Sequence, residues 1–573
     1  MISELLHNFA SLALPYFRSE EKWKARLLLV VIVTLNLGMV YVQVLVNQWL
    51  REFYDILQNL DKAAFLSAIL RFCLLACAYI AQATYMLYLS QMLQIRWRKW
   101  LTDKYLGNWL SHQAYYRINF AAATDNPDQR ISEDINSYAE YTIDLGTNLL
   151  NSVATLISFL GILWLLSGAL DIHFSSRTVV KLPGYMVWAA LFYSVLGTWL
   201  TVKIGNPLVL LNFNQQRFEA DFRFSMVRVR ENSESIALYG GEKQEELHLR
   251  DRFNILMENF WRIMRRRKRL SWLTNTYSQA AIIFPVLMAA PRFFGGEMHL
   301  GGLMQTVGAF AAVHGALSYL ITSYSEIARW HAVIDRLAGF TQTMDRLQQG
   351  AEIPRGAERI QIPDSDIKVD SLNVLLPNGK VLVKDLCLDI EPGTHLLITG
   401  PSGCGKSTLI RSLAGIWPYS RGAISLPGSS TIMFVPQKPY LPLGTLLDAL
   451  CYPHPDGGAY RPEVLMEILE KCGLGHLAAS LEKNEDWSRS LSPGEQQRLA
   501  FSRILLVKPD FIFLDEATAS VDEKSEASLY GLLERDLSHS AVISVGHRSS
   551  LLSWHSEKLT FEGDAAWVKS SLE

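Results

Sequence analysis

The stretch Gly400-Pro401-Ser402-Gly403-Cys404-Gly405-Lys406-Ser407 decides the fold of the second half of this chain. It follows the apolar run Leu396–Ile398 and precedes a helix-like segment that begins at Thr408. This is the G-x-x-x-x-G-K-[ST] pattern of a phosphate-binding loop in its strand–loop–helix setting. Backbone N–H groups from Gly400 to Thr408 are expected to surround phosphate oxygens at the positive end of a helix. Lys406 is expected to reach the β- and γ-phosphates, and the Ser407 hydroxyl to ligate Mg²⁺.

Five further motifs follow this loop along the chain. In order they are Gln437 after the strand-like run Ile432–Val435, the helix start Ser492-Pro493-Gly494-Glu495, the strand end Asp515-Glu516, the turn residue Asp522, and His547 after the strand-like run Ala541–Val545. Each motif alone has an ordinary structural explanation, such as a helix cap or a core histidine. Six motifs in one order indicate a site that binds and hydrolyses a nucleotide.

The expected roles follow from the chemistry of each side chain. Asp515 would hold Mg²⁺ through water, and Glu516 would polarise the attacking water as general base. Gln437 would contact Mg²⁺ and relay the state of the nucleotide, and His547 would donate a hydrogen bond to the γ-phosphate. The helix start at Ser492 presents a hydroxyl and backbone amides, which makes a second anion-binding end.

The first half of the chain contains long apolar segments. Over the whole sequence, hydrophobic residues make up 49% and charged residues only 19%. Six windows contain no Asp, Glu, Lys or Arg, namely Leu27–Leu50, Phe72–Ile95, Leu145–Leu170, Leu182–Val202, Leu270–Pro291 and Met298–Ser325. A helix needs about 20 apolar residues to cross a bilayer of roughly 30 Å. A soluble domain would not need six such windows, so they predict a six-helix transmembrane domain.

Basic residues set the expected orientation. One cluster (Arg96, Arg98, Lys99 and Lys104) follows the second window, and another, at 262–269, precedes the fifth. Because basic residues concentrate on the cytoplasmic side, both termini are expected in the cytoplasm. Attraction to anionic lipid explains the second cluster. With a net charge of -2, the chain is not expected to bind nucleic acid.

The expected domain order is a cytoplasmic lead-in at 1–26, an all-α transmembrane domain with cytoplasmic helix extensions at 27–349, a linker at 350–366, and an α/β phosphate-loop domain at 367–573. Within the spans, His314 is a candidate for contact with a substrate or a proton, although a lone histidine is more often a neutral partner of a neighbouring helix. The six cysteines have no metal-ligand spacing.

Two polar stretches fall in the cytoplasmic extensions. Asp125–Arg130 predicts a turn followed by a helix start, because Asn126-Pro127 punctuates the chain. Glu231–Glu242 predicts a polar helix that ends at Gly240-Gly241. Candidate residues for coupling the two domains are Asp128 and Arg130 in the first stretch, and Glu234 and Tyr239 in the second.

The ordered motifs resemble those of the ATP-binding-cassette (ABC) ATPases, and one membrane domain joined to one cassette resembles a half-transporter. In that family ATP and Mg²⁺ lie between the phosphate loop of one cassette and the signature of another, here Ser492, Gly494 and Glu495. Since this chain carries one of each, the resemblance implies a dimer, most economically a homodimer. Asp522 would lie in the D-loop of the family.

A finer resemblance extends over nearly the whole chain. The stretches at 126–130, 232–242, 395–400 and 436–440 look like the peroxisomal fatty-acyl-CoA subfamily (subfamily D) and its bacterial SbmA/BacA-like relatives. The first two would lie where membrane helices dock on cassettes. The resemblance implies import of small hydrophilic compounds, such as cobalamin or peptides, across a bacterial inner membrane. Two alternatives stay open: export of lipids, drugs or acyl-CoA-like amphiphiles, and a membrane-anchored regulatory ATPase.

The chain departs from the family pattern in two places. The signature has Pro493 where glycine is usual and Glu495 where glutamine is common, so contact with a partner's phosphate would rest on Ser492 and the Gly494 amide. The segment 361–400 contains no Phe, Tyr or Trp to stack on adenine. Leu375 or Leu376 would be an aliphatic substitute.

Overall fold

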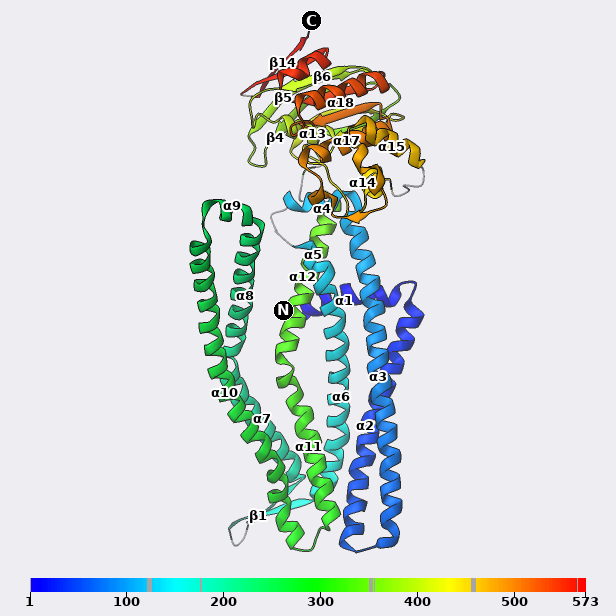
Figure 1. Cartoon of the computed structure of the whole chain (residues 1–573). Coiled ribbons are helices and arrows are strands. Elements are labelled where there is room, and N and C mark those ends of the chain that lie inside the picture. The colour runs from blue at the N-terminus through cyan, green and yellow to red at the C-terminus, as the bar shows by residue number, and fades with distance from the viewer. Residues whose placement is uncertain are drawn as a thin grey trace. The chain divides into compact units, whose positions relative to one another are not determined.

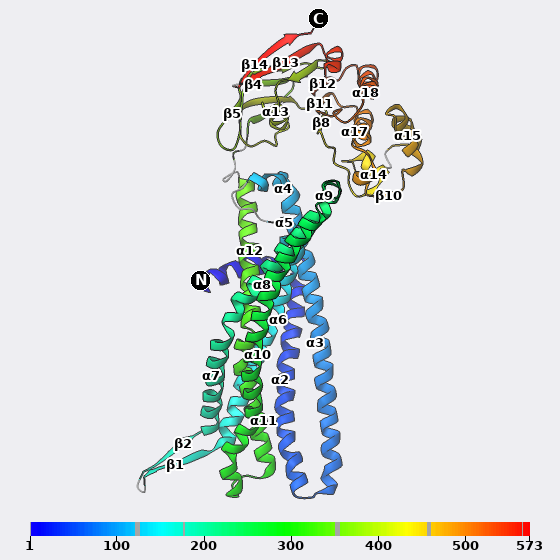
Figure 2. The same cartoon turned by 60° about the vertical axis from the view of Figure 1, so that its left-hand side comes forward.

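A computed structural model describes residues 2–120, 126–175, 178–349, 354, 356–454, 460–563 and 565–572. The chain divides into two compact units, which are drawn in Figures 1 and 2. The membrane unit comprises Met1–Asn108 and Asp125–Gln342, and the cassette unit comprises Trp109–Thr124 and Thr343–Glu573. Each unit has its own core.

Helices make up most of the membrane unit. They are α1 (Ile2–Arg18), α2 (Lys22–Gln58), α3 (Lys62–Leu110), α5 (Pro127–Gln129), α6 (Ile135–Ser167), α7 (Tyr185–Gly205), α8 (Pro207–Glu231), α9 (Ser233–Tyr239), α10 (Glu242–Phe294), α11 (Leu300–Thr322) and α12 (Tyr324–Gln349), with a π-helical turn at Arg130–Asp134. In the described part of the chain, five helical stretches are long and apolar enough to cross a membrane. They overlap five of the six predicted windows.

The remaining window, Leu270–Pro291, is helical throughout and lies within α10. It is not among the five stretches that pass on composition. Its first half carries uncharged polar side chains such as Thr274, Asn275 and Gln279, which lower the apolar character of the helix. The predicted helix is therefore confirmed. By their length and hydropathy, the described helices support five membrane spans rather than six.

The connections alternate between the two ends of the membrane unit. The α2–α3 turn and the α10–α11 connection lie at one end, and α9 lies at the other (Figures 1 and 2). At the first end the chain forms an antiparallel hairpin of β1 (Ala169–Ser175) and β2 (Thr178–Pro183). The membrane domain is helical as predicted, and this hairpin is an addition to it that follows Gly168, whose φ of +61° ends α6.

The second polar stretch forms a helix of its own. The polar helix predicted within Glu231–Glu242 is the short α9, which Asn232 separates from α8. Gly240, with a φ of +65°, ends α9 as the sequence predicts. Tyr239 is 89% exposed and Glu234 is exposed as well, so both candidates lie on the surface of this chain.

Two main sheets organise the cassette unit. The six-stranded sheet has the order β14 (Ala566–Ser571), β13 (Glu557–Gly563), β6 (His395–Thr399), β12 (Ala541–Val545), β11 (Phe511–Asp515) and β8 (Ile432–Val435). The four-stranded sheet has the order β3 (Glu358–Ile362), β7 (Ser420–Pro427), β4 (Ile367–Leu375) and β5 (Val381–Ile390). Because β6, β12, β11 and β8 are parallel, the segments after them leave from one edge of the sheet.

The cassette sheet begins earlier in the chain than the sequence indicates. The strand β3 pairs with β7 in parallel, from Glu358 opposite Ala423 to Ile362 opposite Pro427. This pairing places residues of the expected 350–366 linker inside the four-stranded sheet. Residues 350–353 and 355 of the expected linker lie outside the described residues.

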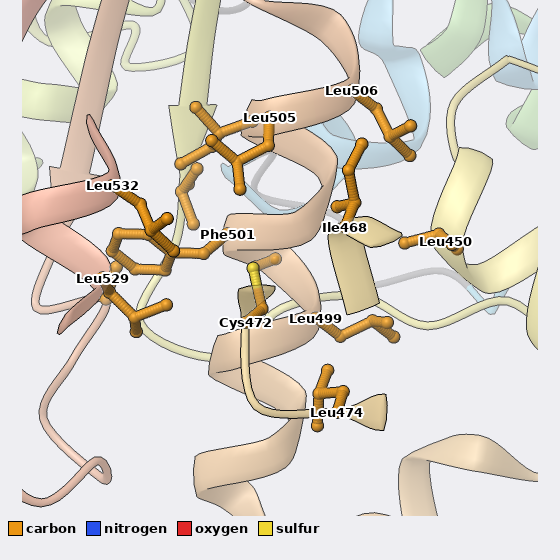
Figure 3. Packing of buried hydrophobic residues seen from close by; sticks show 14 of the residues in the cluster. Leu450, Ile468, Cys472, Leu474, Leu499, Phe501, Leu505, Leu506, Leu529 and Leu532 are labelled. Carbon is orange, nitrogen blue, oxygen red and sulfur yellow. The ribbon is translucent and has the colours of Figure 1, made fainter. Parts of the chain in front are cut away.

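Helices cover the cassette sheets. They are α13 (Lys406–Leu413), α14 (Leu446–Cys451), α15 (Pro462–Lys471), α16 (Trp487–Ser490), α17 (Pro493–Val507) and α18 (Glu523–Asp536). Leucine side chains from α15, α17 and α18 pack around Phe501 and Cys472 (Figure 3). Burial raises the pKa of the Cys472 thiol to about 11, so this cysteine is a packing residue. This core fixes α17, which begins at the signature.

A segment of the predicted transmembrane domain packs with the cassette instead. Trp109–Phe120, which includes α4 (Ala114–Arg117), belongs to the cassette unit. The ring of Phe120 lies 5.4 Å from that of Trp417 and 6.1 Å from that of Tyr419, both at edge-on angles. The segment lies within the expected range of 27–349, and this aromatic packing joins it to the cassette unit. Asp125 of the neighbouring predicted docking stretch lies outside the described residues.

Candidate nucleotide-hydrolysis site

The phosphate-binding loop joins β6 to α13, as predicted. Gly403 and Gly405 have φ values of +78° and +109°, which are strained for residues with a side chain. A Cβ at Gly405 would also lie 3.0 Å from the Leu382 Cβ. Lys406 Nζ donates to the carbonyl oxygens of Gly400 and Pro401, each at 2.9 Å. The loop thus wraps around its lysine at the N-terminus of a helix, which is the setting that suits a phosphate group.

The oxygen atoms expected to hold Mg²⁺ lie next to this loop. Ser407 Oγ donates a hydrogen bond of 2.8 Å to Asp515 Oδ1 at the end of β11. Burial raises the pKa of Asp515, and the charge of Glu516 adds to that shift while the Ser407 hydrogen bond opposes it. A hydroxyl and a carboxylate are the hard oxygen ligands that suit Mg²⁺, and the cation would relieve the cost of burying the charge.

Three predicted catalytic side chains converge at the same edge of the sheet. Gln437 Nε2 donates to Glu516 Oε2 at 2.8 Å, and His547 Nε2 lies 3.7 Å from Glu516 Oε1. These residues follow β8, β11 and β12, so the parallel strands bring them together. The backbone of Glu516 has a φ of +50°, which is uncommon for residues other than glycine. Strain of this type persists where surrounding contacts hold the residue in place.

The signature forms the N-terminus of α17. Ser492 is the N-cap residue, and it exchanges hydrogen bonds with Glu495: Ser492 Oγ and N donate to Glu495 Oε2 at 2.7 and 2.9 Å, and Glu495 N donates to Ser492 Oγ at 3.3 Å. The bonds from Ser492 keep the pKa of Glu495 below its usual range. Pro493 occupies the first helical turn, where its missing N–H does not weaken the helix.

The turn after Glu516 approaches the signature closely. This segment, Ala517–Asp522, is called the D-loop below. A Cβ at Gly494 would lie 2.9 Å from Ser520 O, so the close approach requires glycine. Asp522 caps α18, since Ser525 N donates to its Oδ1 at 3.0 Å. Hydrogen bonding from the side chain of Ser525, and then from its backbone, lowers the pKa of Asp522. The cap fixes the end of the D-loop.

Two side chains that the sequence did not single out join these loops. Gln497 bonds the backbone of Gln437, Glu516 and Ser520. Arg548, directly after His547, donates to the D-loop carbonyls of Val521 at 2.7 Å and Ala519 at 3.0 Å, and it pairs with the buried Glu526 at 3.3 Å. In the sequence Gln497 lies two residues after the signature and Arg548 directly follows His547. This closeness is the signal by which the two residues could have been found.

The coupling candidates in the membrane unit differ in their surroundings. Arg130 Nη1 donates to Asp134 Oδ2 at 2.6 Å, and Arg336 of α12 bonds both oxygens of the same buried carboxylate at 2.9 and 2.7 Å. Asp128 lies exposed in the first turn of α5. His314 packs against the rings of Tyr193 and Tyr277, and its Nε2 is buried without a hydrogen-bond partner among the described residues.

Two family models match the chain: ABC transporter transmembrane region 2 over residues 12–294, and ABC transporter over residues 383–519. The chain is 34% identical to the inner membrane ABC transporter ATP-binding protein YddA of Escherichia coli, over 95% of each chain. It is 28% identical to the human lysosomal cobalamin transporter ABCD4, over 90% of this chain and 88% of the relative.

A solved structure shares the fold. The bacterial Atm1-family ABC exporter with ATP bound superposes with a TM-score of 0.69, covers 94% of this chain and 93% of its own, and is 18% identical in sequence. The helical membrane region followed by an α/β cassette is the fold expected from the sequence. At this identity the likeness concerns the fold alone.

Proposed function

The chain belongs to the ABC transporter family, and from this premise we propose that it works as a homodimer of half-transporters that couples ATP hydrolysis to solute movement across a bacterial inner membrane. The convergence of Gln437, Glu516 and His547 beside the phosphate-binding loop carries the proposal. ATP hydrolysis is the activity of the family. The homodimer, the solute and the direction of movement are the proposed parts.

The residues at the site divide the hydrolysis between them. Glu516 Oε1 accepts the proton of the attacking water, while Gln437 holds the other carboxylate oxygen in place. Lys406 and the loop amides bind the phosphate oxygens, and His547 donates to the terminal phosphate. Ser407, Asp515 and Gln437 would hold Mg²⁺, whose charge when bound neutralises the phosphate oxygens.

The dimer follows from the number of motifs. The chain has one phosphate-binding loop and one signature. In the family, ATP is closed between the loop of one cassette and the signature of the other. The exposed α9, with Glu234 and Tyr239, and the first polar stretch, with Asp128 and Arg130, are proposed to transmit closure of the cassettes to the membrane helices.

We propose cobalamin or peptide-like hydrophilic compounds as the solute, moving into the cytoplasm. The similarity to ABCD4, which is named a cobalamin transporter, supports this choice. The similarity to YddA, which is named an inner membrane protein, supports the proposed location. In this arrangement both termini and the cassette lie in the cytoplasm, on the side of the basic clusters.

One observation favours a second candidate, export of an amphiphile. The membrane unit holds a cavity of about 330 Å³ lined largely by apolar side chains, among them Phe9, Leu145, Leu149 and Trp330. These residues belong to α1, α6 and α12. Leu145 and Leu149 lie in the predicted span Leu145–Leu170. An apolar cavity suits an acyl chain better than cobalamin.

Uptake in cells tests the proposal. Bacteria that lack their own inner-membrane cobalamin importer would express the wild type, Glu516→Gln, or Glu523→Gln, which makes the same change on an exposed carboxylate of α18. Removal of a general base lowers turnover by about 10² to 10⁴-fold. We expect labelled cobalamin to accumulate with the wild type and Glu523→Gln, and not with Glu516→Gln.

The outcomes separate the parts of the proposal. If all three proteins fail to accumulate cobalamin while the purified wild type hydrolyses ATP, cobalamin is excluded. Two further assays then decide between the two remaining solute classes. One is the same uptake assay with labelled peptides. The other measures export, as accumulation of a fluorescent acyl compound inside inside-out vesicles. A purified wild type without ATPase activity would overturn the proposed function as a whole.

A further inference from the structure

We propose that Gln497 is a positioning residue for hydrolysis, which ties the general base and the D-loop to the helix that carries the signature. The proposal rests on the proposed function, in which the signature binds ATP held by a partner cassette. It adds a path by which that binding event sets the geometry of Glu516 in the same chain.

Both polar atoms of the Gln497 side-chain amide make hydrogen bonds. The side chain is only 2% exposed, so its polar atoms depend on partners inside the protein. Nε2 donates to Gln437 O at 3.0 Å and approaches Glu516 O at 3.5 Å, while Oε1 accepts from Ser520 N at 2.8 Å. One side chain of α17 thereby contacts two loops of the site, the one after β8 and the one between β11 and α18.

The bonds to Gln437 and Glu516 close a ring. Gln497 holds the two backbones, and the two side chains bond each other through Gln437 Nε2 and Glu516 Oε2 at 2.8 Å. Glu516 N also donates to Val545 O at 3.1 Å. The carbonyl of Glu516 accepts from Ala519 N at 3.0 Å and lies 3.5 Å from Gln497 Nε2. The strained backbone of the general base is thus held at both its N–H and its carbonyl, which helps a φ of +50° to persist.

The contact with the D-loop is two-sided. Gln497 accepts the N–H of Ser520, and Gly494 lies against the carbonyl of the same residue, where a Cβ would come within 2.9 Å. Positions 494 and 497 are three residues apart, so they lie on one face of α17. Ser520 is therefore held against α17 from both of its peptide groups.

This arrangement links the signature to the base mechanically. Ser492 caps α17, and Gln497 follows it by five residues, about 7.5 Å along the helix. A tilt of α17 when its N-terminus meets a phosphate moves the Gln497 amide with it. Because that amide holds Glu516 and Ser520, engagement of the signature resets the position of the base and of the D-loop together.

The adjacent glutamine offers a matched control. Gln496 is also buried, at 7% exposed, and its Nε2 also donates to two carbonyls, those of Ser488 at 2.8 Å and Leu491 at 2.9 Å. Neither carbonyl belongs to the Gln437, Glu516 or D-loop segments. Replacing either amide by a carboxyl removes the same donor at comparable depth, so only the position distinguishes the two variants.

The experiment compares steady-state ATPase activity of the purified full-length wild type, Gln497→Glu and Gln496→Glu. Misplacing a catalytic group by about 1 Å costs about 100-fold in rate. We therefore expect kcat to fall by about 10 to 100-fold in Gln497→Glu, with KM for ATP within about twofold of wild type. Gln496→Glu should retain kcat within about threefold, because the partners of Gln496 lie outside the loops that carry Gln437, Glu516 and Ser520.

The pH profile gives a readout that a purely structural role would not move. When the introduced carboxyl at position 497 is protonated, its O–H can again donate to Gln437 O. The ratio of kcat in Gln497→Glu to kcat in the wild type should therefore rise as the pH falls. The corresponding ratio for Gln496→Glu should stay flat.

Two results overturn the inference: equal kcat in the two variants, or a flat ratio for Gln497→Glu. If Gln497→Glu does not fold, Gln497→Met keeps the shape without a buried charge and should lower kcat at unchanged KM; unchanged kcat in that variant equally overturns the inference. Failure of the proposed function is distinguished by the wild type, which would then show no ATPase activity.

Discussion

The two units of this protein treat buried polar groups differently. In the cassette, buried side chains such as Gln497, Arg503 and Glu526 bond to loops and turns of the site and its surroundings. In the membrane unit, Gln305 Oε1 and His314 Nε2 are buried without a hydrogen-bond partner among the described residues. Membrane helices satisfy their backbone internally, whereas loops at strand ends depend on side chains to fix them.

Some buried polar groups of the membrane unit do find partners, such as the amides of Asn47 and Asn259. The charged exception to the contrast is the carboxylate of Asp134, with its bonds from Arg130 and Arg336. It lies where α6 begins and α12 passes, beside the first polar stretch. A buried ion cluster there indicates that this end of the membrane unit is held by specific bonds, as the cassette is. The predictions below test where such bonding matters.

The largest effect is expected for Asp134→Asn. Removing one partner of a buried ion pair costs about 3–5 kcal/mol of the free energy of unfolding. The matched control is Glu258→Gln, because the exposed Glu258–Arg262 pair, at 2.6 Å, is expected to contribute at most about 1 kcal/mol. Equilibrium unfolding in mixed micelles measures both. Equal losses would remove the exception and extend the contrast between the units.

Truncation of apolar side chains tests the same contrast for packing. Leu529 in the cassette core is 2% exposed, and Leu165 of α6 is 83% exposed. Leu529→Ala should cost about 2–5 kcal/mol of the free energy of unfolding, because it leaves a cavity. Leu165→Ala should cost less than about 1 kcal/mol in lipid, since lipid tails contact leucine as well as protein does. A similar cost for the two would show that Leu165 packs against protein, for example a second copy of the chain.

The smallest effect concerns pH and the buried His555. Its Nε2 accepts from Ser544 Oγ at 2.8 Å, and its Nδ1–H donates to Leu551 O at 2.7 Å, so the neutral ring is the form that fits. Burial lowers the pKa of His555 from 6.5 to about 4, although the bond to Leu551 opposes this shift. As the pH falls below 6.5, the unfolded chain takes up a proton that the folded chain does not.

Stability from His555 is therefore fully present above pH 6.5 and is lost as the pH falls toward about 4, by about 3 kcal/mol in total. Thermal unfolding of the wild type and His555→Gln at several pH values isolates this contribution from that of the carboxylates. The difference between the two proteins should shrink toward acid pH. A constant difference would contradict the assignment.

Much of the cassette site was predictable because its motifs are local. The phosphate-binding loop, the strand end at Asp515-Glu516 and the helix start at Ser492 each combine a residue type with an adjacent periodic segment. Parallel strands then bring Gln437, Glu516 and His547 to one edge. The windows predicted spanning helices for the same reason, since burial in lipid is a property of continuous composition.

The sequence by itself indicated the long apolar helices, the order of the membrane domain and the cassette, and the candidate residues of the site, because each depends on neighbouring residues. Only the tertiary structure decided that Trp109–Phe120 packs with the cassette, that Asp134 joins two arginines, and that Gln497 rather than Gln496 faces the two loops that carry Gln437, Glu516 and Ser520. These features depend on which face of a helix meets a segment distant in the chain. That choice is made by packing, and the periodicity of a single helix does not encode its partner.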